Sequence, residues 1–405
     1  MKAPHPFRFL APLVVIALAS TAGPSAARSG SRGDFGRPLD GLSMDELKLF
    51  RDGKDAFAQE QDIAHGLGPI FNNTSCGVCH SSPAIGGASA INETRAARVT
   101  GGRYFELPGG SLFQDQAISA SCAETIPADA NVIAKRQTTP LFGLGLVEAI
   151  PDGQIEGYRA EEARFHPGQA GHVHHVVDVA SGATRVGRFG WKAQQATLLA
   201  FSGDAYVNEM GITSRLFPTE NAPNGDQAKL AACDKVPDFE NDDNDIDNFT
   251  NFMRLLAPPP RDRDRFRAHG DRDRDRHDEA GGGGGNRGEE LFERVGCEVC
   301  HHSGFRAASP IRAINGETVD AFSDFLLHDI GTGDGIVQGE ARGNEMRTAP
   351  LWGVSESAPY LHDGSAATLS DAIGRHGNQA AAARRAFLDL SFEEQRALLA
   401  FLDSI

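Results

Sequence analysis

The sequence of 405 residues predicts a mainly α-helical fold of two domains, with a small β-hairpin inserted in the first domain and a disordered linker between them. Three observations predict this fold class. Amphipathic helical patterns with matching start signals lie near both ends of the chain. A short cysteine–histidine motif occurs once in each half, and one low-complexity segment separates the halves.

The first 27 residues have the pattern of a cleaved signal peptide. Lys2 and Arg8 flank the start of an apolar run, and small residues then lead to Ala27. The run is shorter than the roughly 20 residues that span a bilayer, so we expect export to the periplasm and no membrane span. The 39 basic and 55 acidic side chains give a formal charge of −16, and cleavage would leave 37 bases and a charge of −18. Such acidity argues against a nucleic-acid partner.

Composition then divides the chain. Residues 258–287 begin with three prolines, continue with alternating Arg and Asp, and end in a glycine run. This segment has almost nothing to bury, so it predicts a solvated linker. It separates an N-terminal domain at 40–257 from a C-terminal domain at 288–405.

Helix signals recur in both domains. Ser43 with Glu46, and Ser391 with Glu394, form capping boxes in front of amphipathic runs. Two further helices are expected within 191–210 and 245–260. Alternating β-branched runs within 172–191 instead predict the hairpin.

The chemistry is indicated by two C-x-x-C-H motifs. Their residues are Cys76, Cys79 and His80 in the first half, and Cys297, Cys300 and His301 in the second. In an exported protein this spacing is typical of c-type haem attachment: two thiols reach two vinyl groups, and the next imidazole binds iron. We therefore expect two covalently bound haem c groups, one in each cytochrome c-type domain.

Other interpretations of the cysteines explain less. A thioredoxin-like pair would follow a strand and would not need the histidine, and a zinc ribbon would leave both histidines unused. Cys122 and Cys233 remain. In an oxidising compartment they are expected to pair across a loop of about 110 residues, the alternative being two separate buried thiols.

A short internal repeat follows each motif. Residues 136–168 and 347–377 share a Pro-Leu-aromatic-Gly segment, a later Asp-Gly and a histidine near the end. This alignment pairs His166 with His376 and indicates a duplicated haem domain.

These stretches resemble the bacterial dihaem cytochrome c peroxidases, most closely the dihaem oxidoreductase branch that is sometimes labelled thiol oxidoreductases. The stretches that carry the resemblance are "GLGPIFNNTSCGVCH", "PLFGLGLVEAIPD", "GRFGWKAQQATLLAFSGDAYVNEMGITSRLFP", "LLHDIGTGD" and "RTAPLWGVSESAPYLHDGSAATLSDAIGRHG". The resemblance implies an enzyme that takes electrons from a small redox protein or cytochrome at its C-terminal haem. The electrons would pass to the N-terminal haem, where peroxide or another small oxidant is reduced.

The resemblance also assigns iron ligands at the C-terminal haem. The proximal ligands carry over to His80 and His301, and the family's second ligand at the C-terminal haem falls on His376, where the peroxidases place Met. Thr368 is expected to cap the helix before it, and Gly377 to end that helix. Two histidines should lower the potential of this haem relative to His/Met. The alternative is a histidine that only interacts with a helix end, and His362 is expected to hydrogen-bond near the haem.

The other face of the N-terminal haem is less determined. The family's displaceable histidine after the first motif is missing, and the local candidates are His65, His166, His172, His174 and His175. The repeat favours His166, and an iron without a second protein ligand is the alternative. Peroxide cleavage needs a proton-transfer group, for which the resemblance suggests Glu148, Glu161 or Glu162. Pro151 replaces the family's tryptophan between the haems, and Trp191 or Trp352 are the candidate substitutes.

One further site, implied by the resemblance, and two alternative functions complete the expectations. Family members hold a calcium ion between the domains, for which backbone oxygens of residues 357–360 and Asn92 are the candidates. A non-enzymatic dihaem electron carrier and a dihaem enzyme that oxidises a protein side chain in trans both remain open as functions.

Overall fold

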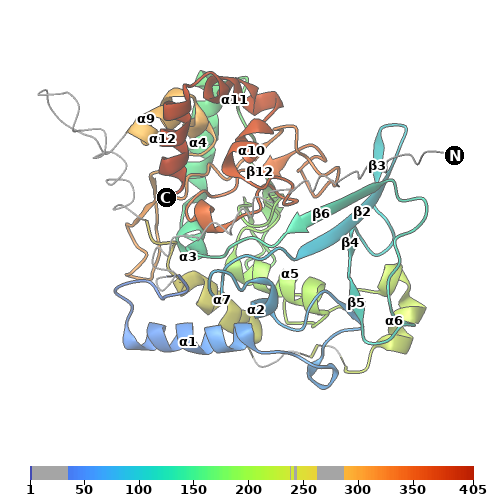
Figure 1. Cartoon of the computed structure of the whole chain (residues 1–405). Coiled ribbons are helices and arrows are strands. Elements are labelled where there is room, and N and C mark those ends of the chain that lie inside the picture. The colour runs from blue at the N-terminus through green and yellow to red at the C-terminus, as the bar shows by residue number, and fades with distance from the viewer. Residues whose placement is uncertain (2–34, 238, 241–243, 262–286) are drawn as a thin grey trace, which may run out of the picture. The chain divides into compact units, whose positions relative to one another are not determined.

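The computed structural model describes residues 1, 35–237, 239–240, 244–261 and 287–405 (Figure 1). The predicted signal peptide beyond Met1, and the linker from 262 to 286, lie outside the described residues. The helices of four residues or more are α1 (Met44–Ala58), α2 (Cys76–Cys79), α3 (Leu144–Glu148), α4 (Asp152–Phe165), α5 (Leu198–Met210), α6 (Gln227–Cys233), α7 (Asp245–Leu255), α9 (Arg287–Arg294), α10 (Leu369–Gly374), α11 (Ala381–Leu388) and α12 (Phe392–Leu402). Among the described helices, none is both long and apolar enough to cross a membrane.

The strands are short except around β2. They are β1 (Ile70–Phe71), β2 (Asn92–Thr100), β3 (Arg103–Phe105), β4 (Leu112–Phe113), β5 (Gln116–Ala117), β6 (Val132–Gln137), β7 (His175–Val177), β8 (Thr184–Val186), β9 (Phe305–Arg306), β10 (Thr318–Val319), β11 (Leu327–His328) and β12 (Met346–Arg347). β2 pairs antiparallel with β6 along one edge and with β3 and β4 along the other. With 34% helix and 15% strand, the fold is mixed α/β, which corrects the expectation of a mainly α chain.

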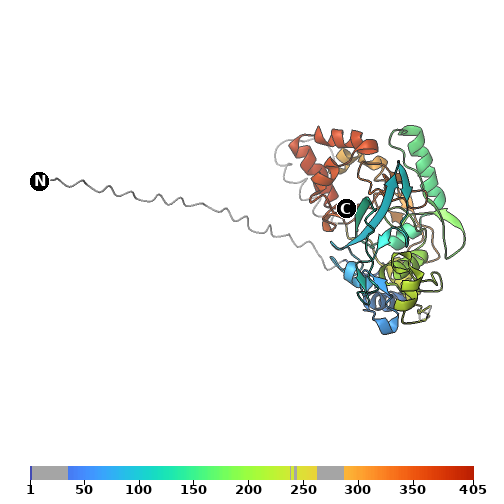
Figure 2. The ribbon, with the colours of Figure 1, turned by 90° about the vertical axis from the view of Figure 1, so that its right-hand side faces the viewer.

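Both halves pack the helix before their C-x-x-C-H motif against the last helix of that half. A Cβ placed on Gly53 of α1 would lie 2.3 Å from the backbone oxygen of Asn248 in α7. A Cβ on Gly288 of α9 would lie 2.3 Å from the oxygen of Ala397 in α12. Each glycine therefore lets two helix backbones meet where a side chain would keep them apart. Figures 1 and 2 place these helix pairs at opposite ends of the described unit.

Aromatic contacts repeat the same arrangement. Phe57 packs against Phe252 with ring centroids 5.0 Å apart, and Phe292 packs edge to face against Phe401 at 5.4 Å. The two phenylalanines of α1 and α9 also lie 5.9 Å and 6.4 Å from the imidazoles of the two motifs. Both motifs are thus positioned by equivalent helix pairs. The capping boxes predicted for α1 and α12 are both present.

The repeated Pro-Leu-aromatic-Gly segment forms the same turn twice. Gly143 and Gly353 both have positive φ, which favours glycine. Gly143 N–H donates to the oxygen of Leu256, and Gly353 N–H to the oxygen of Ile405, each just beyond the last helix of its half. The sequence repeat therefore corresponds to a repeat of structure.

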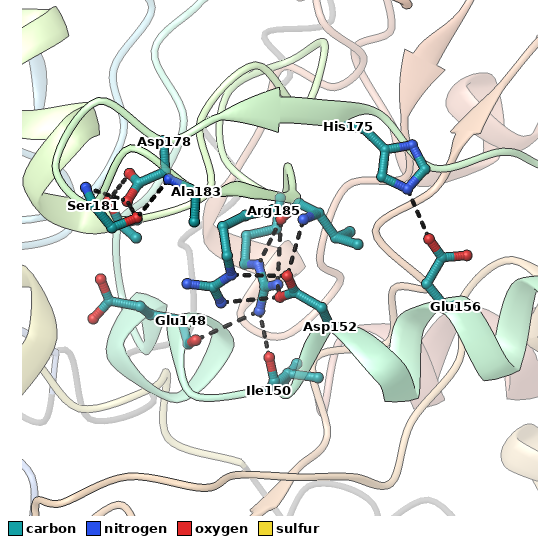
Figure 3. Close-up of polar contacts among 12 residues, drawn as sticks. Glu148, Ile150, Asp152, Glu156, His175, Asp178, Ser181, Ala183 and Arg185 are labelled. Carbon is teal, nitrogen blue, oxygen red and sulfur yellow. Dashed lines mark hydrogen bonds and ion pairs between the residues drawn. The ribbon is translucent and has the colours of Figure 1, made fainter.

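The N-terminal half carries α4 and the β7–β8 pair as an insertion (Figure 3). Asp152, the first residue of α4, accepts from Arg185 of β8 at 2.8 Å, and Glu156 pairs with His175 of β7 at 2.8 Å. Burial raises the pKa of Asp152, but its two arginine partners outweigh it and hold the pKa down to about 2. At neutral pH the Asp152 carboxylate is therefore ionised and ties α4 to the strand pair.

Cys122 and Cys233 form the predicted disulfide. The bond links the segment after β5 to the end of α6 across 111 positions, and both side chains are almost fully buried. A cross-link between such distant positions restricts the unfolded chain, the effect for which the chain-entropy model assigns most stabilisation.

We expect the double substitution Cys122→Ala with Cys233→Ala to lower the free energy of unfolding by about 2–5 kcal/mol. Denaturant unfolding of the two proteins under oxidising conditions measures this difference. Under a reductant that opens the disulfide, the free energy of unfolding of the wild-type protein should approach that of the variant. Equal midpoints for both proteins in the absence of reductant would contradict the expectation.

Candidate functional site

A largely apolar cavity lies beside the second motif. Its lining includes Cys297, Cys300, His301 and His376. The rings of His301 and His376 have centroids 6.5 Å apart. Because a metal–imidazole bond is about 2 Å long, two imidazoles on opposite sides of one metal ion should have centroids roughly 6 Å apart. The pair is therefore spaced to hold one iron between the two rings.

Hydrogen bonds leave the correct nitrogen of each ring for a metal. His301 Nδ1 lies 3.0 Å from the oxygen of Phe322, and His376 Nδ1 lies 2.8 Å from the oxygen of Ala372. A donated Nδ1–H fixes the tautomer in which Nε2 carries the free lone pair. Burial lowers the pKa of His301 to about 4, so its imidazole is neutral, the form that binds metals.

The first motif lines a second cavity. Cys76, Cys79 and His80 contribute to its wall, and His80 Nδ1 lies 3.0 Å from the oxygen of Gly87. Burial lowers the pKa of His80 to about 4. This motif thus presents a neutral imidazole with Nε2 available, as the second motif does.

A second repeat, absent from the letter-by-letter alignment, lies directly before α5 and α10. Phe189 bridges to Gln195, and Tyr360 bridges to Ala366, six positions on in both cases. Within each loop the residues one and four positions after the aromatic ring have positive φ: Gly190, Ala193, Leu361 and Gly364. Thr197 then caps α5, and Thr368 caps α10 as predicted.

Counting from the two capping threonines aligns His376, the predicted second ligand, with a residue of the N-terminal half. His376 is the eighth residue after Thr368, and Ala205 is the eighth after Thr197. Both line their cavities, and so do the residues four, five and twelve positions after each cap. A methyl side chain cannot bind iron. The N-terminal cavity therefore has no ligand at the position where the C-terminal cavity has His376.

The predicted pairing of His166 with His376 is not the one that the fold makes. His166 is the exposed C-cap of α4, inside the inserted segment. No histidine besides His80 lines the N-terminal cavity among the described residues. The other candidates have separate contacts: His65 with Asp62, His172 with Glu345, His174 with Lys192 and His175 with Glu156.

α10 itself is shorter than expected. It ends at Gly374, three residues before the predicted stop at Gly377. His376 therefore lies just past the helix, and its Nδ1 contact to Ala372 orients the ring. Residues 191–197, expected to be helical, form the irregular turn that precedes Thr197.

The N-terminal cavity differs from the C-terminal one in having acidic residues in its lining. Glu209 of α5 lines it, and Glu209 Oε2 accepts from Asn72 Nδ2 at 2.7 Å. Burial, then neighbouring Glu93, raises the pKa of Glu209 to about 7. The charge of Glu209 in turn adds to the raised pKa of both Cys76 and Cys79. An acid of this kind can exchange a proton at neutral pH.

Glu93 lines the same cavity but is held as an anion. Arg95 Nε donates to Glu93 Oε1 at 2.6 Å, and Arg136 lies 3.7 Å away. Burial alone would raise the pKa of Glu93, but the two arginines hold it below its ordinary value. Of the two carboxyls, Glu209 is therefore the one suited to proton transfer.

Comparison with known proteins agrees with this arrangement. The family model described as "Di-haem oxidoreductase, putative peroxidase" matches residues 112–232 and 276–405, more than half of the chain. The chain belongs to this family. It is therefore a dihaem redox enzyme, and its two cavities, each with a C-x-x-C-H motif and a neutral imidazole, fit one haem each.

Solved structures give only distant likenesses. Hydrazine synthase of Kuenenia stuttgartiensis is 16% identical with a TM-score of 0.41, covering 98% of this chain and 100% of that one. A MauG-like protein associated with microbial copper homeostasis is 17% identical with a TM-score of 0.37, and the match covers 91% of this chain and 92% of that one. A variant of the diheme peroxidase BthA from Burkholderia thailandensis is 15% identical with a TM-score of 0.38, and the match covers 91% of this chain and 86% of that one. Scores this low carry no argument, and among curated proteins none matches.

In this dihaem oxidoreductase the three acids suggested by the resemblance lie away from the N-terminal cavity. Glu148 Oε2 accepts from Arg254 at 2.6 Å, and Glu148 Oε1 from Leu198 N–H at the start of α5. In Figure 3 only its backbone oxygen faces the arginines bound to Asp152. Glu161 is exposed on α4. Glu162 is buried next to Asp324, beside the second motif.

Of the two tryptophans, Trp191 lies where the cavities adjoin. Its side chain lines both, whereas Trp352 lines only the C-terminal one. Trp191 Nε1 donates to the oxygen of Gln137 at 2.9 Å, and the Trp191 ring lies 6.2 Å from the ring of His362. Trp191 is thus the candidate to substitute for the family's tryptophan, and His362, which also lines the C-terminal cavity, contacts the Trp191 ring edge to face.

Two buried oxygens beside this junction suit a cation. Asn92 Oδ1 and Gln137 Oε1 belong to residues paired across β2 and β6. Among the described residues neither oxygen has a hydrogen-bond partner. Uncharged amide oxygens are ligands that calcium accepts, so Asn92 fits the predicted role.

Proposed function

We propose that this dihaem oxidoreductase takes electrons at its C-terminal haem and reduces peroxide, or another small oxidant, at its N-terminal haem. Cys76, Cys79, Cys297 and Cys300 would attach the two groups covalently, with His80 and His301 as proximal ligands. A haem bound at the N-terminal site would supply the iron that exchanges electrons with the oxidant. Peroxide would take up two electrons and two protons and leave as two molecules of water.

One observation carries the proposal: Ala205 stands where the C-terminal half has His376. A cavity closed by two imidazoles suits electron entry, because no ligand has to move. A cavity with a methyl group at that position suits a small substrate. The same contrast weighs against an electron carrier in which both haems have two histidine ligands.

The polar groups of the N-terminal cavity give the substrate class. Glu209 can accept a proton from one peroxide oxygen and return it to the other, which is the task of a general acid–base group. Arg95, paired with Glu93, keeps a fixed positive charge in the same wall. The cavity therefore favours a small polar oxidant over an apolar molecule.

The spin state of each haem tests the proposal. In the purified oxidised and half-reduced protein, we expect a high-spin signal from the N-terminal haem and rapid reaction with hydrogen peroxide. Two low-spin haems at every redox level, with no reaction, would instead indicate an electron carrier. A third outcome is a high-spin signal in a protein that oxidises an added protein but does not turn over peroxide with a reduced electron donor. That outcome would favour the enzyme that oxidises a protein side chain in trans.

Substitution of His376→Ala should convert the C-terminal haem alone to high spin. The iron would lose one of the two imidazoles whose rings now lie 6.5 Å apart. Electron paramagnetic resonance of the oxidised protein separates the two haem signals. The matched control is His362→Ala. His362 lines the same cavity, and its loss should leave the C-terminal haem low-spin. An unchanged spectrum in His376→Ala would show that another group binds the iron.

Location, metal and partner follow from the same proposal. We place the protein in the periplasm, since a signal peptide is predicted and the buried disulfide suits an oxidising compartment. Asn92, with backbone oxygens of residues 357–360, would hold one calcium ion. A small redox protein or cytochrome would deliver electrons to the C-terminal domain at 288–405, across the linker from the domain at 40–257.

A further inference from the structure

Arg347 is a buried cation that lines the C-terminal cavity. It is 8% exposed and belongs to β12. Its Nε donates to the oxygen of Gly190 at 2.9 Å, and its Nη1 donates to the oxygen of Thr348 at 2.8 Å. Both acceptors are neutral carbonyls. No carboxylate lies within ion-pair distance of Arg347 among the described residues.

The other strongly buried bases of this region all have a carboxylate. Arg136 pairs with Asp334 at 2.7 Å, Lys192 with Asp334 at 3.1 Å, and Arg188 with Asp152. Asp324 is the acid whose charge acts on Arg347, but its carboxylate is already bound to His328 at 2.9 Å. Burial lowers the pKa of Arg347 to about 10, so the guanidinium still carries its charge at pH 7.

A buried charge without a partner is strongly unfavourable, so an anion is expected in the cavity that Arg347 lines. The cavity that receives the haem is the one with the ligand pair His301 and His376. Haem carries two propionate carboxylates, and a guanidinium is the side chain best matched to a carboxylate. We propose that Arg347 is the counterion of a propionate of the C-terminal haem and raises the potential of that haem.

The N-terminal half lacks this charge at the equivalent position, and the arginines that line its cavity, Arg95 and Arg136, are paired with Glu93 and Asp334. Counting back three positions from Pro350 gives Arg347, and counting back three from Pro140 gives Gln137. Gln137 also lines its cavity, but with a neutral amide. The two haems would thus differ both in their second ligand and in the residue at this position, which is an unpaired cation in the C-terminal cavity and a neutral amide in the N-terminal one. This inference rests on the dihaem character of the family and not on peroxide as the substrate.

Substitution of Arg347→Gln tests the inference by giving the C-terminal half the residue of the N-terminal half. Loss of the positive charge should favour ferric iron and lower the midpoint potential of the low-spin haem. We expect at least a tenfold change in its reduction equilibrium, which is about 59 mV for a one-electron couple. Spectroelectrochemical titration resolves the two haems, and the N-terminal potential should change much less.

Two further variants complete the experiment. Arg342→Gln removes the same charge from a side chain that is 77% exposed, and should leave both potentials unchanged because solvent screens it. Arg347→Lys keeps the charge and should hold the potential near that of the wild type while shifting the propionate bending band in resonance Raman spectra. If the Arg347→Gln protein cannot be obtained with both haems bound, the propionate bending band of the Arg347→Lys protein tests the proposal. An unchanged potential in a fully loaded Arg347→Gln protein, or an unchanged band in Arg347→Lys, would overturn the proposal. Neither readout depends on peroxide.

Discussion

Substitution of Ala205→His should convert the N-terminal haem to a low-spin state and stop its reaction with peroxide. The new imidazole would stand eight residues after Thr197, as His376 stands eight after Thr368. If it binds iron in 99% of molecules, only about 1% keep an open site, and the rate of the peroxide reaction falls about 100-fold. Stopped-flow measurement of that reaction, with electron paramagnetic resonance of the same sample, gives both results.

The matched control for this prediction is Ala205→Leu. Leucine adds similar bulk to the cavity but offers no ligand atom, so the haem should stay high-spin. A low-spin haem in the leucine variant would mean that distortion, not ligation, causes the change. A high-spin haem in a well-folded histidine variant would show that α5 does not bring position 205 to the iron, which would remove the main support for an open site at Ala205.

Short sequence signals with local geometry were enough for part of the fold. The two capping boxes, the disulfide and the turn at Thr368 all depend on residues whose own chemistry determines the contact. β2 has no such signal. Its sequence, NETRAARVT, places Glu93 and Arg95 in the wall of a cavity, so the alternation of apolar and polar residues that identifies a strand is lost. The strand content was therefore underestimated at the site itself.

An insertion prevents the sequence alignment from pairing Ala205 with His376. Gly353 and Tyr360 are seven positions apart, whereas their counterparts Gly143 and Phe189 are 46 apart, because α4 and the β7–β8 pair lie between them. An alignment by letters therefore joined Asp152 to Asp363 and reached His166. The true correspondence left one sequence trace, Ala-Thr-Leu at residues 196–198 and again at 367–369. A match of three common residues is a weaker alignment signal than a match between two histidines, so the alignment through His166 was preferred.

Glu209 could not be predicted either, because a single glutamate in a helix is ordinarily a surface residue. Its role follows only from what surrounds it: the Asn72 amide, the ion-paired Glu93 and the two thiols of the first motif. These residues come from three separate segments of the chain, 72–79, β2 and α5. Their meeting gives Glu209 both its burial and its raised pKa.

Substitution of Glu209→Gln should lower the rate constant for peroxide reduction by about 10²–10⁴-fold, the usual contribution of a general acid–base group. In the wild-type protein the ionised carboxylate must accept the proton. Because the pKa of Glu209 is raised to about 7, the rate should fall as the pH drops below about 7 and level off above it. The glutamine variant should lose this dependence on pH while its N-terminal haem keeps a high-spin spectrum.

Asp204→Asn provides the matched control for Glu209→Gln. Asp204 lies on the same helix, and burial raises its pKa to about 6, but it does not line the cavity. Its loss should leave the plateau rate of peroxide reduction near that of the wild type and keep a pH dependence, with the inflection moved to lower pH because the charge of Asp204 is one cause of the raised pKa of Glu209. Equal losses in the two variants would indicate a general effect on α5 and remove the proton-transfer role of Glu209. If the Glu209→Gln variant instead reacts at the wild-type rate with a high-spin haem, the site is open as proposed but another group moves the proton.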